Sequence, residues 1–277
     1  MMKSAVTICL VPEAKQGPFV FHCDPTAAGL QESCRIAAEL GFHGVEVFPE
    51  SAEAFPREHL MRSLATHHLS LAAVGTGAGW VKHKLHMCHA DSQLRSQARA
   101  FIAGIIDRAG EFGAPAIVGS MQGRFEGNIS RDTGLNILAD ALASLGDHAS
   151  RHGQVLLYEP LNRYETNLFT QQAEAATFLQ SRDCGNVRLL CDLFHMNIEE
   201  ADSARAILDA GSLVGHIHWA DSNRWAMGRG QTNPNPIIAA LSSIGYDGYL
   251  SAEIFPRPTA TEAARQSAES MHRFFSQ

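Results

Sequence analysis

The chain has 277 residues, 45% of them hydrophobic and 18% charged, which is enough to bury one large core. Its 22 lysines and arginines against 29 aspartates and glutamates give a net charge of −7, and no basic block occurs, so DNA and RNA are not expected partners. No run approaches the roughly 18 apolar residues that cross a membrane, and no secretory signal is recognisable, so we expect a cytoplasmic protein. The six cysteines form no CxxC pair and are expected to be reduced and buried.

Short apolar and β-branched runs recur along the chain, with amphipathic segments between them. The runs are continuously apolar rather than alternating, as is typical of parallel strands covered on both faces. In chain order, we expect strands at 5–11, 44–48, 70–76, 114–120, 154–160, 187–193, 214–220 and 249–255.

The segments between these runs have the pattern of amphipathic helices. The segment 91–113 begins with a candidate N-cap, Asp91, and ends at Gly113, while the segment 26–41 ends at Gly41 in the same way. Eight strands alternating with about eight helices predict an α/β fold, a (β/α)₈ TIM barrel in a single domain over residues 1–277. An open doubly wound sheet is the alternative, but no GxGxxG follows the first strand.

The last four predicted strands all end in a polar side chain of the kind that binds metals. In such a barrel, functional side chains gather at the C-terminal ends of the strands. The four residues, spaced 33, 26 and 35 apart and thus about one βα unit from each other, are Glu159, Asp192, His218 and Glu253. Each acid alone could equally cap a strand or form an ion pair. Together, three crowded carboxylates and an imidazole predict a site for Mn²⁺, Mg²⁺ or Co²⁺.

The motifs around these positions resemble a known family. The motifs are YEPLNRYE (158–165), DLFHMNIEE (192–200), HIHWADSNR (216–224) and AEIF (252–255). They are similar to those of the sugar phosphate isomerase/epimerase family of xylose isomerase-like TIM barrels, and most of all to its D-tagatose/D-psicose 3-epimerase branch. The resemblance is densest over residues 154–255.

This resemblance implies an isomerase that epimerises a ketose at C3 through an enediolate. It implies metal binding by the four strand-end residues, most often of Mn²⁺, with Mg²⁺, Co²⁺ or Zn²⁺ as alternatives. Within that set, Glu159 and Glu253 would form the acid/base pair. Glu165, His195 and Arg224 would contact the carbonyl end of a small sugar or sugar phosphate. A homodimer or homotetramer is a further expectation from the family.

Other activities stay open within the same chemistry. Aldose–ketose isomerisation of the hydroxypyruvate type and dehydration of a keto-inositol both begin with an enediolate. A silent sugar-binding barrel is the non-enzymatic alternative, although neither carboxylate of the acid/base pair is missing. A three-zinc DNA-repair endonuclease is disfavoured by departures from the pattern of those relatives. The departures are Met227, Gln231, Asn233, Asn235 and, at the ends of the third and fourth strands, Thr76 and Ser120.

The segment 79–89 follows the third predicted strand and is rich in histidine and lysine. Its candidates are His83, His86 and His89, three residues apart, with Lys82 and Lys84. It could form a second metal site, a solvated loop and helix start, or a lid over the substrate.

Two further features have more than one interpretation. The glycine-rich segment 119–127 with Arg124 could cradle a phosphate or form an ordinary turn. Glu46, read as the end of the second strand on the same rim, could orient a substrate hydroxyl or a ligand histidine. Three aromatic side chains could form apolar walls or simply pack in the core: Trp80, Trp219 and Phe255.

Overall fold

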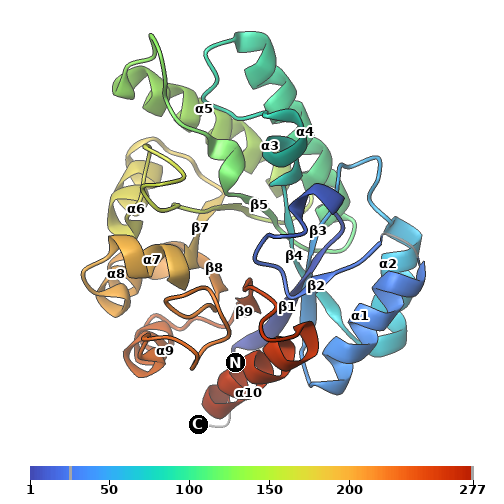
Figure 1. Cartoon of the computed structure of the whole chain (residues 1–277). Helices are drawn as coiled ribbons and strands as arrows, with labels where there is room; N and C mark the ends of the chain where they lie inside the picture. The colour runs from blue at the N-terminus through green and yellow to red at the C-terminus, as the bar shows by residue number, and fades with distance from the viewer. Residues whose placement is uncertain (25–26, 276–277) are drawn as a thin grey trace.

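Eight parallel strands close into a barrel in this computed structural model, which describes residues 1–24 and 27–275 (Figure 1). The strand order is β1-β3-β4-β5-β6-β7-β8-β9, and β9 pairs with β1, while the two-residue β2 pairs with β1 outside the barrel. The strands are β1 (Lys3–Cys9), β2 (Phe21–His22), β3 (Gly44–Phe48), β4 (Ser70–Gly75), β5 (Ala116–Val118), β6 (Leu156–Tyr158), β7 (Val187–Asp192), β8 (Val214–His218) and β9 (Tyr249–Ala252). The predicted (β/α)₈ barrel is confirmed, although several strands end earlier than the apolar runs.

Ten α-helices surround the barrel in the described residues. They are α1 (Ala27–Glu39), α2 (Arg57–His67), α3 (Ala78–His83), α4 (Ser92–Gly110), α5 (Arg131–Ser150), α6 (Gln172–Ser181), α7 (Leu193–Glu199), α8 (Ser203–Ala210), α9 (Pro234–Ser243) and α10 (Ala260–Phe275), with 3₁₀ turns at Pro12–Ala14, Ser120–Gln122 and Gly211–Leu213. Asp91 caps α4 as predicted, because its Oδ1 accepts a hydrogen bond from the Gln93 amide at 2.7 Å. The predicted segment 26–41 corresponds to α1, and its first residue lies outside the described part of the chain.

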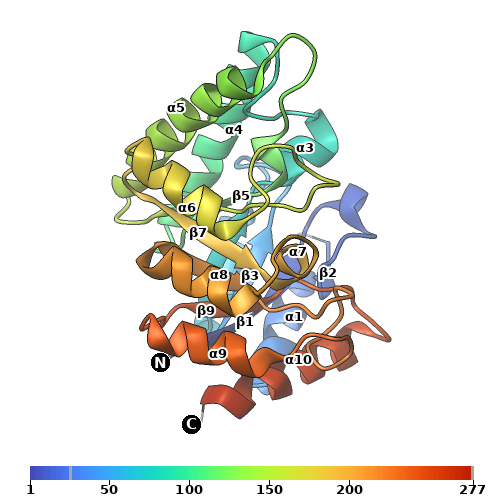
Figure 2. The ribbon, with the colours of Figure 1, turned by 90° about the vertical axis from the view of Figure 1, so that its left-hand side faces the viewer.

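Two of these helices, α3 and α7, are additions to the eight that connect the strands. Both follow a strand closely, and Figure 2 shows them on the side of the barrel toward which the β7 arrow points. The helix α7 begins without any loop because Asp192, the last residue of β7, is also its N-cap. The Oδ1 atom of Asp192 accepts from the amides of Phe194 at 2.7 Å and His195 at 3.3 Å.

The inside of the barrel is divided between apolar and polar side chains. One buried cluster fills part of the interior with Ala73, Ile117, Leu157 and Leu190. On the facing strands, the buried interior residues are polar: Thr7, Glu46, His216 and His218. The large apolar core lies outside, between the strands and the helices. The polar half of the interior is therefore the part that supports the site described next.

Two further features of the fold concern its cysteines and the length and apolar character of its helices. All six cysteines are free. Five of them are buried, as predicted, and Cys23 is partly exposed. No helix among the described residues combines the length and apolar character that crossing a membrane requires.

Candidate functional site

The four predicted strand-end residues lie together on one rim of the barrel. Glu159 follows β6, Asp192 ends β7, His218 ends β8 and Glu253 follows β9, so four adjacent strands each supply one side chain. All four are buried, and one ligand atom from each lies within 4.8 Å of the others. The predicted clustering is thus observed, and it is the spacing of one βα unit that produces it.

His218 occupies the centre of this cluster. Its Nδ1 lies 3.3 Å from Asp192 Oδ2, 3.5 Å from Glu159 Oε1 and 3.5 Å from Glu253 Oε2. Burial acts to lower the pKa of His218, but Glu253 and Glu46 outweigh it and raise the pKa well above its ordinary value. Without a cation, the His218 ring is therefore protonated, and its positive charge offsets part of the negative charge of the surrounding carboxylates.

Glu46 supports the cluster from below. Its Oε1 accepts a hydrogen bond from His218 Nε2 at 3.0 Å, and its Oε2 accepts one from His216 Nε2 at 2.7 Å. Because Nε2 of His218 is held in this way, Nδ1 is the nitrogen directed at the carboxylates. Burial acts to raise the pKa of Glu46, but His218 and His216 outweigh it and keep the group ionised.

The placement of Glu46 corrects the prediction that it ends a strand on the rim. It lies in the middle of β3, with two residues of the strand after it, and its side chain is 0% exposed. Side chains alternate along a strand, so this one points into the barrel one layer beneath the rim. Of its two predicted roles, orientation of a histidine fits this position, and contact with a substrate hydroxyl does not.

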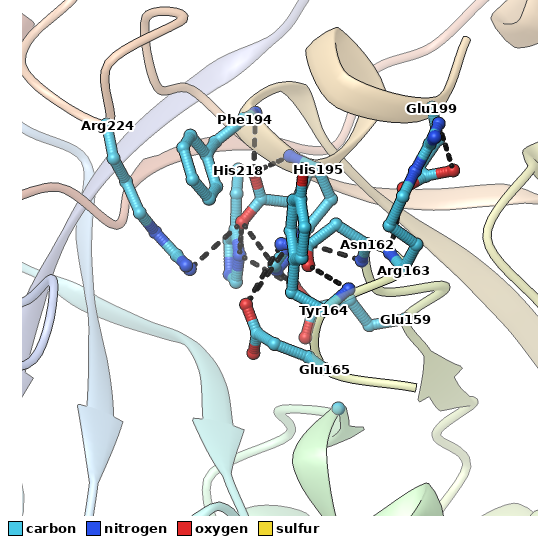
Figure 3. A network of polar contacts seen from close by, with 12 residues as sticks. Glu159, Asn162, Arg163, Tyr164, Glu165, Phe194, His195, Glu199, His218 and Arg224 are labelled. Atoms are coloured by element: carbon cyan, nitrogen blue, oxygen red, sulfur yellow. Dashed lines mark hydrogen bonds and ion pairs between the residues drawn. The ribbon is translucent and has the colours of Figure 1, made fainter. Parts of the chain in front are cut away.

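His195 is held with a defined ring nitrogen toward the cavity. Its Nδ1 accepts hydrogen bonds from the Asn162 amide at 3.3 Å and from Asn162 Nδ2 at 2.8 Å (Figure 3). Since a backbone N–H is always a donor, Nδ1 is unprotonated, and in the neutral ring the proton is on Nε2. Burial lowers the pKa of His195 and favours this neutral form. The Nε2–H lies 3.8 Å from Glu159 Oε1.

Arg224 closes the other side of the cluster. Its Nη2 donates to Asp192 Oδ2 at 3.3 Å and makes a second, short contact with Glu253 Oε2. Figure 3 shows the guanidinium beside the ring of Phe194, whose centroid is 4.8 Å from Cζ. Glu165 also reaches the cavity, where its Oε1 accepts from Asn162 Nδ2 at 3.0 Å. All three residues predicted to contact a substrate thus border the same space.

Asp221 fixes the loop that presents Arg224. Its Oδ2 accepts from the amides of Gly228 at 2.7 Å and Gly230 at 2.8 Å, while its Oδ1 accepts from those of Ser222 and Thr232. These bonds fold residues 221–232 into one compact turn, in which Arg224 adopts a left-handed conformation with φ 60°. A left-handed conformation is unfavourable for an arginine, so the hydrogen bonds of the surrounding turn must hold the Arg224 backbone in it.

Two carboxylates of the cluster, Glu159 and Asp192, differ in acidity. Burial raises the pKa of Glu159 to about 7. Burial acts on Asp192 in the same sense, but the neighbouring imidazoles and Arg224 outweigh it and hold the pKa of Asp192 below its ordinary value. Without a cation, Glu159 therefore exchanges a proton near neutral pH while Asp192 stays ionised, and burial raises the pKa of Glu253 as well.

The donor set fits a divalent cation. Glu159 Oε1 is buried without a hydrogen-bond donor, although it lies among the other ligand atoms. Three carboxylates face one arginine and one histidine, so negative charge is in excess. Gly119 leaves room for this arrangement, since a Cβ at that position would lie 2.3 Å from Glu159 Oε2. These residues could hold a metal ion, and three carboxylates with one imidazole are ligands for a hard or intermediate metal.

Three residues of the cluster, Glu159, His218 and Glu253, form the floor of a cavity of about 560 Å³, whereas Asp192 is fully buried and does not line it. Its walls come largely from the first half of the chain, including Phe19, Phe48, Trp80 and His86. Apolar walls around a few converging polar groups are typical of sites for small molecules.

The segment 79–89 contributes to a wall and not to a second metal site. His83 packs near Phe101, while the His86 and His89 rings lie 5.1 Å apart, and His89 Nδ1 accepts from the Asp91 amide at 2.9 Å. Among the described residues, the three histidines do not form a group of converging ligand atoms. The segment is in part the helix α3, which places Trp80 at the cavity and so supports the lid interpretation.

The segment 119–127 has the form of a glycine turn. The amides of Gln122 and Gly123 already donate to the carbonyls of Gly119 and Ser120. Gly123 has φ +75°, and Arg124 lies 3.5 Å from Glu126. These two amides are therefore not free to bind a phosphate, and the arginine is paired.

Residues 34–274 match the family described as xylose isomerase-like TIM barrels. The chain belongs to this family. A D-psicose 3-epimerase of Agrobacterium fabrum is 28% identical over 237 residues, which cover 81% of this chain and 78% of that enzyme. The predicted resemblance to this family and its 3-epimerase branch is confirmed.

Other members of the family are similar over different lengths. A 3-dehydro-D-guloside 4-epimerase of Escherichia coli is 35% identical over 121 residues, 44% of this chain and 46% of that enzyme, so the chain spans about half of it. An L-ribulose 3-epimerase of Methylomonas sp. is likewise matched over 46% of its length. The structure of a D-allulose 3-epimerase from Methylomonas sp. in complex with D-allulose has a TM-score of 0.84 and 22% identity, covering 98% of this chain and 96% of that one. This last likeness shows the shared fold.

Sequence reasoning missed several residues of the site. Asn162, Phe194 and His216 lie within or beside the quoted motifs and hold His195, Arg224 and Glu46. The alternation of His216 and His218 in one strand was a signal, because residues two apart share a face. Trp219, considered as a wall, is instead fully buried and donates from Nε1 to Ser270 Oγ at 2.9 Å, away from the cavity.

Proposed function

We propose that this protein is a metal-dependent epimerase that inverts C3 of an unphosphorylated ketose. The observation that carries the proposal is the convergence of four buried ligand atoms within 4.8 Å at the floor of the cavity. Sugar inversion beside a ketone needs a base on each side of the carbon and stabilisation of the enediolate. The floor of the cavity offers both.

Glu159, Asp192, His218 and Glu253 would hold the metal, and we propose Mn²⁺. A cation here supplies Lewis-acid stabilisation of negative charge on the sugar oxygens. Three carboxylates and one imidazole favour Mn²⁺, Mg²⁺ or Co²⁺ over metals that seek thiolates. Binding of a cation would also replace the proton that keeps His218 positive.

Glu159 and Glu253 would transfer the protons. They follow β6 and β9, with β7 and β8 between them, so they reach a sugar from different sides. One carboxylate removes the C3 proton, and the other returns a proton to the opposite face. The pair is matched for this exchange, because each member is a buried carboxylate beside the same imidazole, His218.

His195 and Arg224 would orient the carbonyl end of the substrate. His195 Nε2 and Arg224 Nη2 are donors that approach Asp192 Oδ2 from two sides, at 3.9 Å and 3.3 Å. Glu165, which is 44% exposed, can accept from a sugar hydroxyl beside His195. Fixed donors and acceptors of this kind hold the reacting carbon between the two glutamates.

The preference for a ketose and against a phosphate has separate support. The relatives that match over about four-fifths of the chain are named D-psicose or ketose 3-epimerases. Two cationic side chains near the cavity are paired with carboxylates, Arg124 with Glu126 at 3.5 Å and Lys82 with Glu13 at 3.4 Å and, more closely, with Glu50. A phosphate would have to displace these carboxylates.

Proton exchange in D₂O tests the proposal directly. Protein loaded with Mn²⁺ is incubated with free and phosphorylated ketoses, and NMR follows deuterium at each carbon. We expect deuterium at C3, with the C3 epimer appearing, for a free ketose. Deuterium at C1 would instead indicate aldose–ketose isomerisation, and exchange with no ketose despite bound metal would refute the proposal. Arg124→Ala should leave the rate with the free ketose unchanged.

A further inference from the structure

A second group of converging ligands lies on the outer surface, between α4 and α5. Asp107 is in the last turn of α4, His148 is in the last turn of α5, and His152 follows α5 in the turn after it. Figures 1 and 2 show the two helices side by side. None of the three residues belongs to the barrel cluster or lines the cavity.

The three side chains meet at one carboxylate oxygen. His148 Nε2 lies 2.6 Å from Asp107 Oδ1, and His152 Nε2 lies 2.9 Å from the same atom. One ligand atom from each residue lies within 4.8 Å of the others. The side chains are 51%, 25% and 29% exposed for Asp107, His148 and His152, so ions in solution can reach them.

The helix α4 has no side chain where the ring of His152 packs. A Cβ on Gly110 would lie 2.4 Å from His152 Cγ and 2.6 Å from its Nδ1, closer than real atoms approach. The ring can therefore lie against α4 and present Nε2 to Asp107 only because residue 110 is a glycine. This packing removes rotational freedom from the ring before any ligand binds.

We propose that Asp107, His148 and His152 form a surface site for Zn²⁺ or a similar borderline divalent cation. Imidazole nitrogens are preferred ligands of such metals, and two imidazoles with one carboxylate is a known zinc ligand set that leaves a position for water. The cation takes the place of the hydrogens that now join both Nε2 atoms to Asp107. With one carboxylate instead of three, this site differs in metal preference from the barrel cluster.

The site lies at the end of the barrel opposite the cavity. Helices of a (β/α)₈ barrel run back from the C-terminal ends of the strands, so the last turns of α4 and α5 lie near the starts of β5 and β6. A cation bound there links the same two helices that the hydrogen bonds of His148 and His152 to Asp107 already join. It does not touch the residues that face the cavity.

Metal uptake by full-length variants tests the proposal. Protein stripped with a chelator is dialysed against Zn²⁺, and bound metal is counted for wild type, His148→Ala and His152→Ala. His59→Ala, which removes a partly exposed histidine from α2, is the matched control. We expect each site variant to bind one equivalent less than wild type and the control to bind the same number. Metal held in the barrel is common to all variants and cancels in the comparison.

A second measurement uses wild-type protein, so it does not depend on variants that fold. NMR of the imidazole nitrogens should show the Nε2 resonances of His148 and His152 shifting together as Zn²⁺ is added. Equal uptake by wild type and both variants, or unchanged resonances of these two rings, would overturn the proposal. The cluster would then be a hydrogen-bonded link between the helices.

Discussion

The two halves of the barrel contribute differently to the site. The ends of β6 to β9 supply the four ligands proposed for the metal at the cavity, while α7 supplies His195 and the loop after β8 supplies Arg224. The first half supplies the walls, with Phe19, Phe48 and Trp80, and one buried support, Glu46.

The second half of the barrel therefore carries the proposed chemistry, and the first half determines the shape of the cavity. A ligand at a strand end is fixed by the barrel itself, and four adjacent strands give four converging positions. A wall depends on the conformation of the loops after β1 and β4, including the short helix α3. If the division is real, changes in the second half should reduce turnover, whereas those in the first half should act through position and affinity.

The largest effect is expected from Glu253→Gln and Glu159→Gln. Each removes one carboxylate of the proposed proton-transfer pair, and turnover should fall by about 10³-fold. Rates from C3 deuterium exchange and circular dichroism of the same samples would separate lost chemistry from lost fold. Retention of more than a tenth of the wild-type rate by both variants would exclude these roles.

The sharpest test of the boundary between the halves is Glu46→Gln. Both His216 and His218 donate to Glu46, and a glutamine offers one acceptor and one donor group to them. Metal affinity should fall by about 10- to 100-fold, measured by competition with a chelating dye. Ser4→Ala, another buried polar residue of the barrel that binds His43, should lower stability without this loss of affinity.

Gly119→Ala tests whether the first half also leaves room for the chemistry. The new Cβ would displace Glu159 Oε2, and turnover should fall about tenfold or more. Gly77→Ala is the matched control in the same cavity, because its Cβ would lie 3.5 Å from Ser120 Oγ, an ordinary contact. Equal rates for the two variants would show that Glu159 tolerates displacement.

The smallest effect concerns the pH dependence of stability without metal. Glu159 has a pKa of about 7 in the fold against an ordinary value of 4.5, so the folded state binds this proton more tightly than the unfolded chain does. Its contribution to the free energy of unfolding is therefore present below pH 4.5 and is lost as the pH rises to about 7. Urea unfolding with a chelator at several pH values should show this fall, and Glu159→Gln should reduce it. An identical pH dependence in the variant would contradict the raised pKa.

The sequence predicted the second half of the site better than the first for a physical reason. Apolar runs locate strand ends, so Glu159 and Asp192 could be placed without coordinates. The sequence places Glu46 on the rim because only two residues of its apolar run follow it. A difference of two residues along a strand moves a side chain by one layer of the barrel interior. Asn162 could not be found because its partner, His195, is 33 residues away and their contact depends on the loop.

Asp192 joins a strand, a helix and the ligand cluster in a single residue. Its Oδ1 starts α7 and its Oδ2 faces His218, so no loop exists at this point that could lengthen or drift during evolution. An inserted residue would uncouple the helix from the strand and turn the carboxylate away at once. A change in the length of the loops after β1 and β4 would, by contrast, reshape the walls of the cavity while the four ligands stay in register.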